Sequence, residues 1–502
     1  MSPRARVVAA TGVRELAEDL VREIAGGARF AGLMGTARPD GLLLSAHMAP
    51  AAGGQIETRE ALLPAALGSY PALTPAIGAA FWYERELHDL FGVVPAGHPR
   101  LEPLILPLHE AGQARPRPGL TGPVPEGIWP DEHSVPRHVM GAGLFTIPHG
   151  PVRSGVMESI EYLVETPGED IPHLNMRIFY KHRGVEKRFE RMSPTDGVLL
   201  AERTEGAASV AHALAYCHAL EAITGAEVPP AGGLVRVMHA ELERLAAHLD
   251  ATTRLADAAG LAVAAARFGA YREKVLRVVS VASGSRFGRG VVIPGGVRSL
   301  PAIGGADLAS QLGRLEGAIR GDARTLMGTA SFLDRLRRTG PLPPERAREH
   351  GALGPVGKAS GHATDDRAAR PYDGYPDLDL GVTAHRPEGD ALARLRVRWE
   401  EVWQSFALLG QAARRLAAIG DAGRLAAPCD PVAGRAVGWA EAPQGEVLYD
   451  VAVADGRIIR CRPRSASFHN LVLMHEVFAG DILTDFPFIE ASFGLSVAGA
   501  AL

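Results

Sequence analysis

Charged and titratable side chains gather in three short stretches, and their types suit proton transfer. The first stretch contains Arg153, and the second contains His182, Arg183 and Glu186. The third is the run Glu202-Arg203-Thr204-Glu205. Carboxylates and guanidinium groups in a partly buried cleft have shifted proton affinities, which proton transfer requires. Each stretch taken alone is a weak signal, because His182 beside Arg183 could equally be a hydrogen-bonded structural pair.

A fourth polar stretch runs from Phe81 to Gly92 and is followed by Gly97-His98-Pro99. On a helix, Glu84 would share a face with His88, and Arg85 would share a face with Asp89. The simplest interpretation is a solvated helix end that carries salt bridges.

The cysteines give no sign of a metal centre. Cys217, Cys429 and Cys461 are far apart, and the sequence contains no CxxC motif. Thiolate-bound metals usually draw on cysteines in close pairs. We therefore expect three buried, reduced thiols and no metal or other cofactor bound by this chain.

These stretches lie on three predicted parts of the chain. Residues 1–106 mix helical and strand patterns and predict a small α/β domain, with a helix at Val13–Ile24 and strand pieces at Gly41–Ala46 and Gly54–Glu57. Residues 107–137 are rich in proline and glycine, which predicts a linker or extended arm. Residues 138–502 form the larger predicted domain.

Apolar stripes at helical spacing dominate the larger domain. They run over Val235–Leu249, Leu308–Ile319 and Leu392–Leu409, and a helical bundle would bury all three. Alternating residues predict β-hairpins over 144–180 and again over 435–462, where Asp455-Gly456 marks a turn. Residues 465–478 are expected to be helical. The predicted fold class is α+β, with peripheral hairpins around a mainly helical bundle.

Composition excludes some functions. The 502 residues carry a net charge of −4 without a basic tail, which argues against a nucleic-acid partner. No apolar run approaches the roughly 18 residues of a membrane helix, and the start lacks a secretory signal pattern. We expect a cytoplasmic chain that reaches a membrane only through partners.

The stretch from Phe81 to Gly92 with Gly97-His98-Pro99 resembles the signature of the C subunit of bacterial complex I. The same segment opens the large subunits of formate-hydrogenlyase-type hydrogenases, where it packs against an iron–sulfur subunit. Later motifs resemble, in order, the complex I D subunit and the group 4 nickel–iron hydrogenase large subunit. These motifs include Gly150-Pro151-Val152-Arg153, the run from Tyr180 to Lys187, the run from Glu202 to Gly206, the run from Ala240 to Leu245 with His248, and Pro294-Gly295-Gly296-Val297.

The resemblance implies a nickel–iron centre that these residues cannot hold. In the hydrogenases, two CxxC motifs supply four thiolates to the metals. The corresponding positions here are Glu205, Ala208, Ser496 and Gly499. Nickel–iron chemistry depends on soft thiolate ligands, so we expect no hydrogenase activity.

The complex I resemblance also has gaps. Its quinone headgroup is thought to meet a histidine and a tyrosine, which correspond here to Met157 and Gly206, and Arg153 replaces another loop histidine. In this family, the segments that carry Arg153, His182, Arg183, Glu186 and Glu205, together with Glu202 and Arg203, meet at the former active site. We weigh a proton-coupling or altered-substrate pocket against a fossil site whose polar groups satisfy one another.

Two functions remain open on this resemblance. The first is a fused C/D-type subunit of an ion-translocating oxidoreductase complex, peripheral on the cytoplasmic side of the cell membrane. Its partners would be a small iron–sulfur subunit, a ferredoxin-like subunit and antiporter-like membrane subunits, with the iron–sulfur cluster in the partner. The second is a non-catalytic scaffold that docks the iron–sulfur subunit to the membrane arm. A quinone-reducing or true hydrogenase subunit is a weaker alternative.

Overall fold

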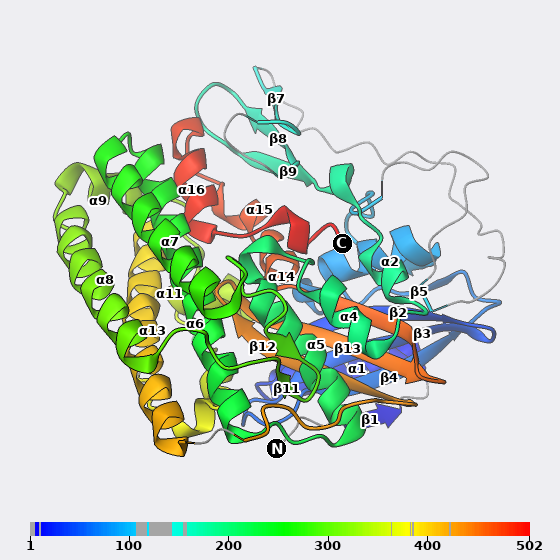
Figure 1. The fold of residues 1–502 in the computed structure, drawn as a ribbon. Coiled ribbons are helices and arrows are strands. Elements are labelled where there is room, and N and C mark those ends of the chain that lie inside the picture. The colour runs from blue at the N-terminus through cyan, green and yellow to red at the C-terminus, as the bar shows by residue number, and fades with distance from the viewer. Residues whose placement is uncertain are drawn as a thin grey trace.

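A computed structural model of the 502-residue chain describes most of its length (Figure 1). The described residues are 6–9, 12–106, 118–119, 143–153, 158–362, 364–381, 383, 386–420 and 423–502. Nearly all of the predicted linker therefore lies outside them, and the domain boundaries at 106 and 137 remain a prediction.

The N-terminal part is a four-stranded sheet covered by a helix. Its strands are β1 (Arg6–Ala9), β2 (Arg29–Arg38), β3 (Gly41–Ala49) and β4 (Glu57–Pro64), in the order β1-β4-β3-β2. The predicted helix is confirmed as α1 (Val13–Ala25), which buries Leu16 and Leu20. The predicted strand piece at Gly54–Glu57 is wrong, since β4 begins only at Glu57. Gly53 and Gly54 have φ values of +76° and +94°, which suit a turn rather than a strand.

Helix α2 (Phe81–Phe91) lies where the helix was expected, but the prediction of a solvated end is wrong. Glu84, Arg85, Glu86 and Asp89 are all buried. The carboxylate of Asp89 accepts hydrogen bonds from the amides of Leu104, Ile105 and Leu106. The charges therefore tie neighbouring backbone to the helix. Two short strands, β5 (Ser69–Pro71) and β6 (Val94–Ala96), flank it.

The larger part is built around five long helices, and three of them, α6, α8 and α13, carry the predicted apolar stripes. They are α5 (Ser209–Thr224), α6 (Pro230–Ala258), α7 (Ala262–Ser283), α8 (Gly305–Leu326) and α13 (Ala391–Ile419). The apolar residues at three- and four-residue spacing that make up the three predicted stripes are all buried. The shorter helices are α3 (Val185–Phe189), α4 (Pro194–Ala201), α9 (Ala330–Leu336), α10 (Pro344–Glu349), α11 (Gly354–Ala359), α12 (Asp366–Ala369), α14 (Ala466–Leu471), α15 (Met474–Val477) and α16 (Phe486–Phe493).

Small antiparallel sheets flank the helices, and both predicted hairpin regions are confirmed. One sheet contains β7 (Phe145–His149), β8 (Glu161–Thr166) and β9 (His173–Arg177), and the other contains β12 (Gly434–Ala442), β13 (Gly445–Ala454) and β14 (Arg457–Arg464). Asp455 and Gly456 form the β13–β14 turn with φ values of +49° and +67°, a backbone geometry typical of a two-residue hairpin. A shorter pair, β10 (Val292–Ile293) and β11 (Gly296–Val297), encloses Pro294-Gly295.

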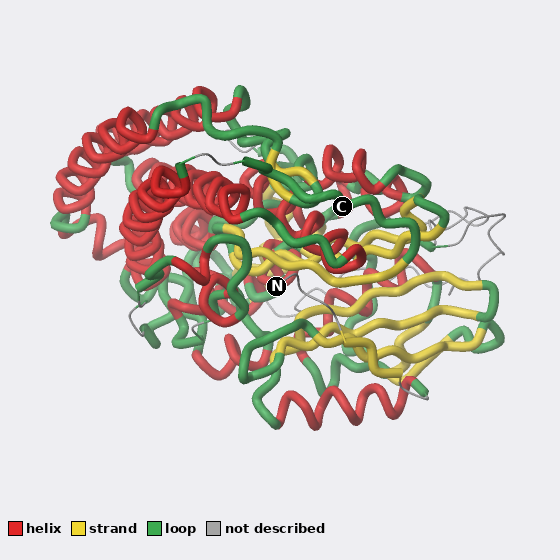
Figure 2. Tube along the Cα trace, turned by 60° about the horizontal axis from the view of Figure 1, so that its bottom comes forward, coloured by secondary structure: helices red, strands yellow, loops and turns green. Residues whose placement is uncertain are grey.

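The β12–β14 sheet joins the helical part to the N-terminal sheet. Gly438 on β12 is essential to close packing, because a Cβ there would lie 2.1 Å from the Ala215 carbonyl oxygen of α5. On the other side, the Arg460 guanidinium donates to the Gly35 carbonyl of β2 at 2.9 and 3.1 Å. Figure 2 shows strands gathered on one side of the molecule and long helices on the other.

The structure also bears on the predictions about the cysteines and about membrane-spanning helices. Cys217, Cys429 and Cys461 are free and buried, as expected. Within the described part of the chain, no helix combines the length and hydrophobicity needed to cross a bilayer.

Candidate functional site

Glu205 lies at the centre of a buried polar network where α5 begins. It precedes the short 3₁₀ turn η3 (Gly206–Ala208), and its side chain is almost fully buried. Its carboxylate accepts a hydrogen bond from Ser467 Oγ at 3.0 Å, and His212 Nε2 lies 3.5 Å away. Ser467 Oγ in turn accepts from the Ser496 amide at 3.1 Å. One serine therefore links Glu205 to the C-terminal segment.

Gly499 lies directly against Glu205. A Cβ at Gly499 would be 2.1 Å from Glu205 Oε2 and 2.9 Å from Ser465 Oγ. Ser465 Oγ donates to the Gly499 carbonyl at 2.6 Å, which holds the backbone in this position. With the Glu205 carboxylate in this position, a Cβ at residue 499 would force that carboxylate to move.

Ser496 and Ala208, the other two positions that the resemblance matches to metal ligands, lie in the same neighbourhood. The Ser496 hydroxyl donates to the Glu158 carboxylate, which also accepts from the Val497 amide at 2.6 Å. Ala208 is buried, and its amide donates to the Glu205 carbonyl at 3.2 Å. The structure thus brings Glu205, Ala208, Ser496 and Gly499 to one place, joined by hydrogen bonds or close packing.

A chain of polar side chains continues from Glu205 into the core. Tyr449 Oη lies 2.9 Å from His212 Nδ1 and 3.1 Å from Thr204 Oγ1. Burial raises the pKa of Tyr449 well above its ordinary value, so the phenol keeps its proton. Hydrogen bonds thus join His212, Tyr449 and Thr204, whereas His212 Nε2 faces Glu205 at 3.5 Å and forms no hydrogen bond among the described residues.

Arg183 links two backbone segments of this region by hydrogen bonds. Its guanidinium donates to the carbonyl oxygens of Arg203 at 3.1 Å, Thr204 at 2.6 Å and Ala498. Burial lowers its pKa, although nearby carboxylates oppose this effect. Arg183 thus joins the loop that carries Glu205 to the segment that carries Gly499.

The remaining predicted site residues are spread over separate contacts. Glu186 lies 2.5 Å from the Arg460 guanidinium and 3.3 Å from Arg462 Nε, at the β14 junction. Burial lowers the pKa of His182, whose Nδ1 is buried without a hydrogen-bond partner among the described residues. Arg153 makes a two-point ion pair with Glu490 of α16, at 2.7 and 2.8 Å. These three side chains do not touch Glu205.

Glu202 and Arg203 also point elsewhere. Glu202 is buried, accepts from the Gly290 amide at 2.7 Å and pairs with the half-exposed side chain of Arg203. Of the two positions matched to the quinone-orienting groups, Gly206 is exposed on η3, and Met157 lies outside the described residues.

These residues do not fit a nickel–iron centre. The four positions supply a carboxylate, a methyl group, a hydroxyl group and no side chain, whereas such a centre needs soft thiolates. The carboxylate and the hydroxyl are already hydrogen-bonded to Ser467 and Glu158. Nothing in the part of the chain that the structure describes brings together three His, Cys, Asp or Glu side chains suited to a metal.

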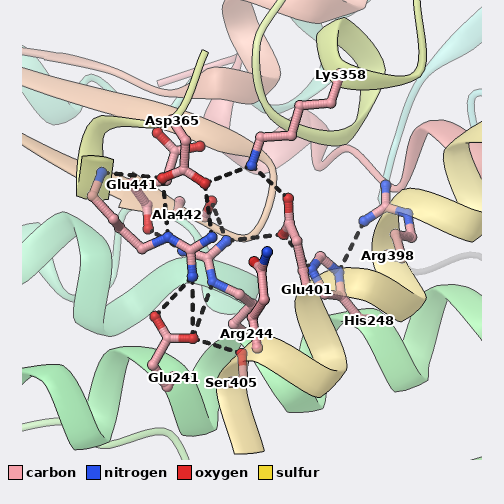
Figure 3. Close-up of polar contacts among 12 residues, drawn as sticks. Glu241, Arg244, His248, Lys358, Asp365, Arg398, Glu401, Ser405, Glu441 and Ala442 are labelled. Carbon is pink, nitrogen blue, oxygen red and sulfur yellow. Dashed lines mark hydrogen bonds and ion pairs between the residues drawn. The ribbon is translucent and has the colours of Figure 1, made fainter. Parts of the chain in front are cut away.

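A second buried network lies between α6, α13 and α11 (Figure 3). Lys358 Nζ donates to Glu401 at 2.8 Å and to Asp365 at 2.6 Å. His248 is placed between Glu401, at 2.7 Å from its Nε2, and Arg398, at 3.1 Å from its Nδ1. Burial lowers the pKa of His248 to about 4, so the ring is neutral and its Nε2–H faces Glu401.

This second network was not predicted, although Glu241, Arg244 and His248 lie in one of the motifs that carry the family resemblance. Glu241, Arg244 and His248 are spaced by three and four residues on α6, and Arg398, Glu401 and Ser405 repeat that spacing on α13. The polar stripe was a usable signal, because residues at this spacing share one helix face. Ser467 and Tyr449 gave no comparable signal, since they reach Glu205 only through the tertiary fold.

Known proteins resemble both the N-terminal part and the larger part of this chain. Residues 259–429 match the family model of the respiratory-chain NADH dehydrogenase 49 Kd subunit, and residues 40–116 match that of the 30 Kd subunit. A carbon monoxide-induced hydrogenase of Rhodospirillum rubrum is 32% identical over 352 residues, covering 69% of this chain and 96% of the relative. The chain belongs to the group 4 hydrogenase and complex I subunit family.

Other members of the family support the same assignment. Formate hydrogenlyase subunit 5 of Escherichia coli is 29% identical over 449 residues, covering 84% of this chain and 75% of the relative. A solved structure of the archaeal membrane-bound sulfane sulfur reductase has a TM-score of 0.67 at 24% identity, covering 73% of this chain and 100% of that chain. That likeness establishes a shared fold.

Proposed function

We propose that this chain is a subunit of a membrane-associated, ion-translocating oxidoreductase complex, in which a proton-handling carboxylate replaces the metal pocket. The observation that carries the proposal is the contact between Glu205 and Gly499. Two former ligand positions have become a buried carboxylate and the space that accommodates it. A carboxylate in that position can exchange protons, whereas it cannot replace thiolates at nickel.

The geometry suggests how protons would move. Ser467 donates to Glu205, and the hydroxyl hydrogens of Ser467, Tyr449 and Thr204 can rotate between neighbouring acceptors. His212 lies between Tyr449 and Glu205, with its two ring nitrogens facing the two groups. Arg183 keeps the two loops in register. These residues would pass a proton while electrons travel through a cluster in a partner.

Partners and location follow from the family. We infer a small iron–sulfur subunit, a ferredoxin-like subunit and antiporter-like membrane subunits, with the chain peripheral on the cytoplasmic side of the membrane. The names of the relatives support a membrane link, since one is a membrane-bound hydrogenase subunit alpha of Pyrococcus furiosus, 29% identical over 365 residues. The electron donor and acceptor are then properties of the whole complex.

A second candidate is a scaffold without a chemical role. The observation in its favour is that the predicted site residues largely satisfy one another, as Glu186 does with Arg460 and Arg153 with Glu490. Both candidates place the chain in the same complex, and they differ only in whether Glu205 must ionise.

Glu205→Gln in the intact complex separates the two. Glutamine keeps the size and can still accept from Ser467, but it cannot ionise. A proton-handling role predicts that turnover and ion translocation fall by about 100-fold, as for loss of a proton-transfer group. Exposed Glu15→Gln is the matched control. If the assembled Glu205→Gln complex keeps its turnover and ion translocation, the proton-handling role is rejected and the scaffold function is retained.

A further inference from the structure

A cavity between α8 and α13 combines positive charge with an apolar wall. Its volume is about 390 Å³, and it lies between the C-terminal half of α8 and the N-terminal half of α13. These helices are neighbours at the outer edge of the helical part (Figure 1). Four arginines and one glutamate line it, together with Ala323, Met327, Trp399 and Trp403. A positive cavity of this size, in a chain with a net charge of −4, suits an anionic ligand.

Two of the four arginines are available to a ligand. Arg386 pairs with Glu400, and Arg320 donates to Glu316 at 2.7 and 3.0 Å. By contrast, the guanidinium groups of Arg324 and Arg396 form no ion pair or hydrogen bond with the residues that the structure describes. An arginine fork binds phosphate oxygens in two-point geometry, so two arginines that line one cavity and are unpaired among the described residues suit a phosphate group.

The aromatic wall limits what the rest of the ligand can be. Trp399 and Trp403 stack at a centroid distance of 5.4 Å, and the Arg320 guanidinium lies 4.1 Å from the centre of the Trp403 ring. Trp399 also contacts Phe268, at 5.6 Å between ring centres. Because these contacts occupy both indole rings, a flat base would find little ring surface on which to stack, which disfavours a nucleotide. Ala323 and Met327 line the same cavity as the two indoles, and this apolar part of the lining suits an aliphatic chain.

We propose that this cavity binds the phosphate headgroup of an anionic membrane phospholipid. Arg324 and Arg396 would hold the phosphate, while the tryptophan edges and Met327 would contact the glycerol and the first acyl carbons. Tryptophan and arginine are the side chains that meet the headgroup region at membrane surfaces. The inference rests on the proposed membrane-associated function and names a direct lipid contact for a chain that would otherwise depend on partners.

The test is binding of the full-length chain to vesicles of phosphatidylcholine with or without phosphatidylglycerol. Arg324→Gln/Arg396→Gln should weaken binding to the anionic vesicles by about 25-fold, since each basic residue near such a surface contributes about fivefold. Arg277→Gln/Arg314→Gln is the control, because it removes the same charge from exposed arginines of α7 and α8 outside the cavity. That control should change binding by no more than about twofold.

Other outcomes would overturn the lipid assignment. If the cavity and control variants weaken vesicle binding equally, binding comes from general electrostatic attraction and the cavity is not a specific lipid site. If inorganic phosphate alters tryptophan fluorescence while the cavity variant still binds vesicles normally, the site takes a soluble anion. If vesicles never bind but the cavity variant loses the membrane subunits on purification, the ligand is an acidic protein surface. None of these results affects the turnover test of Glu205, so the two proposals fail separately.

Discussion

At the scale of single residues, the central feature is the close contact between Glu205 and Gly499. Glu205 and Gly499 occupy one small volume, since a Cβ on the glycine would lie 2.1 Å from the carboxylate. Gly499→Ala should therefore destabilise the chain by about 1–3 kcal/mol through overpacking. In Glu205→Ala/Gly499→Ala the methyl gains room, so the two effects should couple by about 0.5–3 kcal/mol.

Urea unfolding of the two single variants and the double variant measures this coupling. Gly313→Ala is the control, because residue 313 is exposed on α8 and a Cβ there meets nothing within 4 Å. That change should be neutral or stabilising. Purely additive effects at 205 and 499 would show that the contact does not control stability.

A second residue-scale prediction concerns Asp373, which Arg236 contacts at 2.9 Å and His218 at 3.1 Å. Burial alone would raise its pKa, but these two partners outweigh burial and lower the pKa to about 2 from 3.8. A lowered pKa gives stability that is present above pH 4 and is lost as pH falls towards 2. By linkage, the contribution near neutral pH is on the order of 2–3 kcal/mol.

The stability difference between Asp373→Asn and the unaltered chain tests this sign. The variant should be less stable at pH 7. The difference in unfolding free energy between the variant and the unaltered chain, measured by urea unfolding, should shrink as the pH is lowered from 4 to 2.5. Asp379→Asn, at a more exposed position nearby, is the control. A pH-independent difference would mean that ionisation of Asp373 is not what stabilises the fold.

At the scale of elements, buried charge fixes how α6, α11 and α13 pack. Lys358 is buried between Glu401 and Asp365, so Lys358→Met leaves two buried carboxylates short of a partner. Removing one member of a buried pair costs about 3–5 kcal/mol, and we expect a loss of that size. Lys274→Met on the exposed face of α7 should change the unfolding free energy by less than about 0.5 kcal/mol. Equal effects at both lysines, measured by chemical unfolding, would contradict this account.

Some helices and strands could be predicted from the sequence, and others could not. The helices α6, α8 and α13 were predictable because each carries one apolar stripe, and the β13–β14 hairpin because Asp455-Gly456 fits its turn. Helix α5 offered no such stripe, since it is buried on nearly every side. The burial of α2 was missed because the hydrogen-bond partners of Glu84 and Asp89 lie on loops that approach only in the folded chain. The assignment of Glu205, Ala208, Ser496 and Gly499 to metal-ligand positions rests on the family resemblance and stays a prediction. Ser467, Tyr449 and Glu158 could not be predicted, because they reach these positions only through the tertiary fold.

At the scale of the whole molecule, the N-terminal sheet and the later segments share one core. One hydrophobic cluster includes Leu44 and Trp82 from the first part and Phe468 and Ile489 from the last. Buried pairs cross the same boundary, including Arg29 with Glu446 at 2.6 Å and Glu86 with Arg462 at 2.5 Å. We therefore expect the two parts to unfold together.

Hydrogen exchange at increasing denaturant measures this cooperativity. Backbone amides of β2–β3 and of β12–β14 should lose protection at the same denaturant concentration. Arg462→Ala should lower that concentration for both segments, because it leaves Glu86 buried without its partner. Earlier exchange in β2–β3 alone would show that the N-terminal part is an independent folding unit.

Nickel analysis of the purified whole complex tests the central claim most directly. The claim is that Glu205, Ala208, Ser496 and Gly499 form a packed, hydrogen-bonded site that cannot hold a nickel–iron centre. We predict no nickel in stoichiometric amount with this chain and no hydrogen evolution by the active complex. One nickel per chain together with hydrogen evolution would contradict the account.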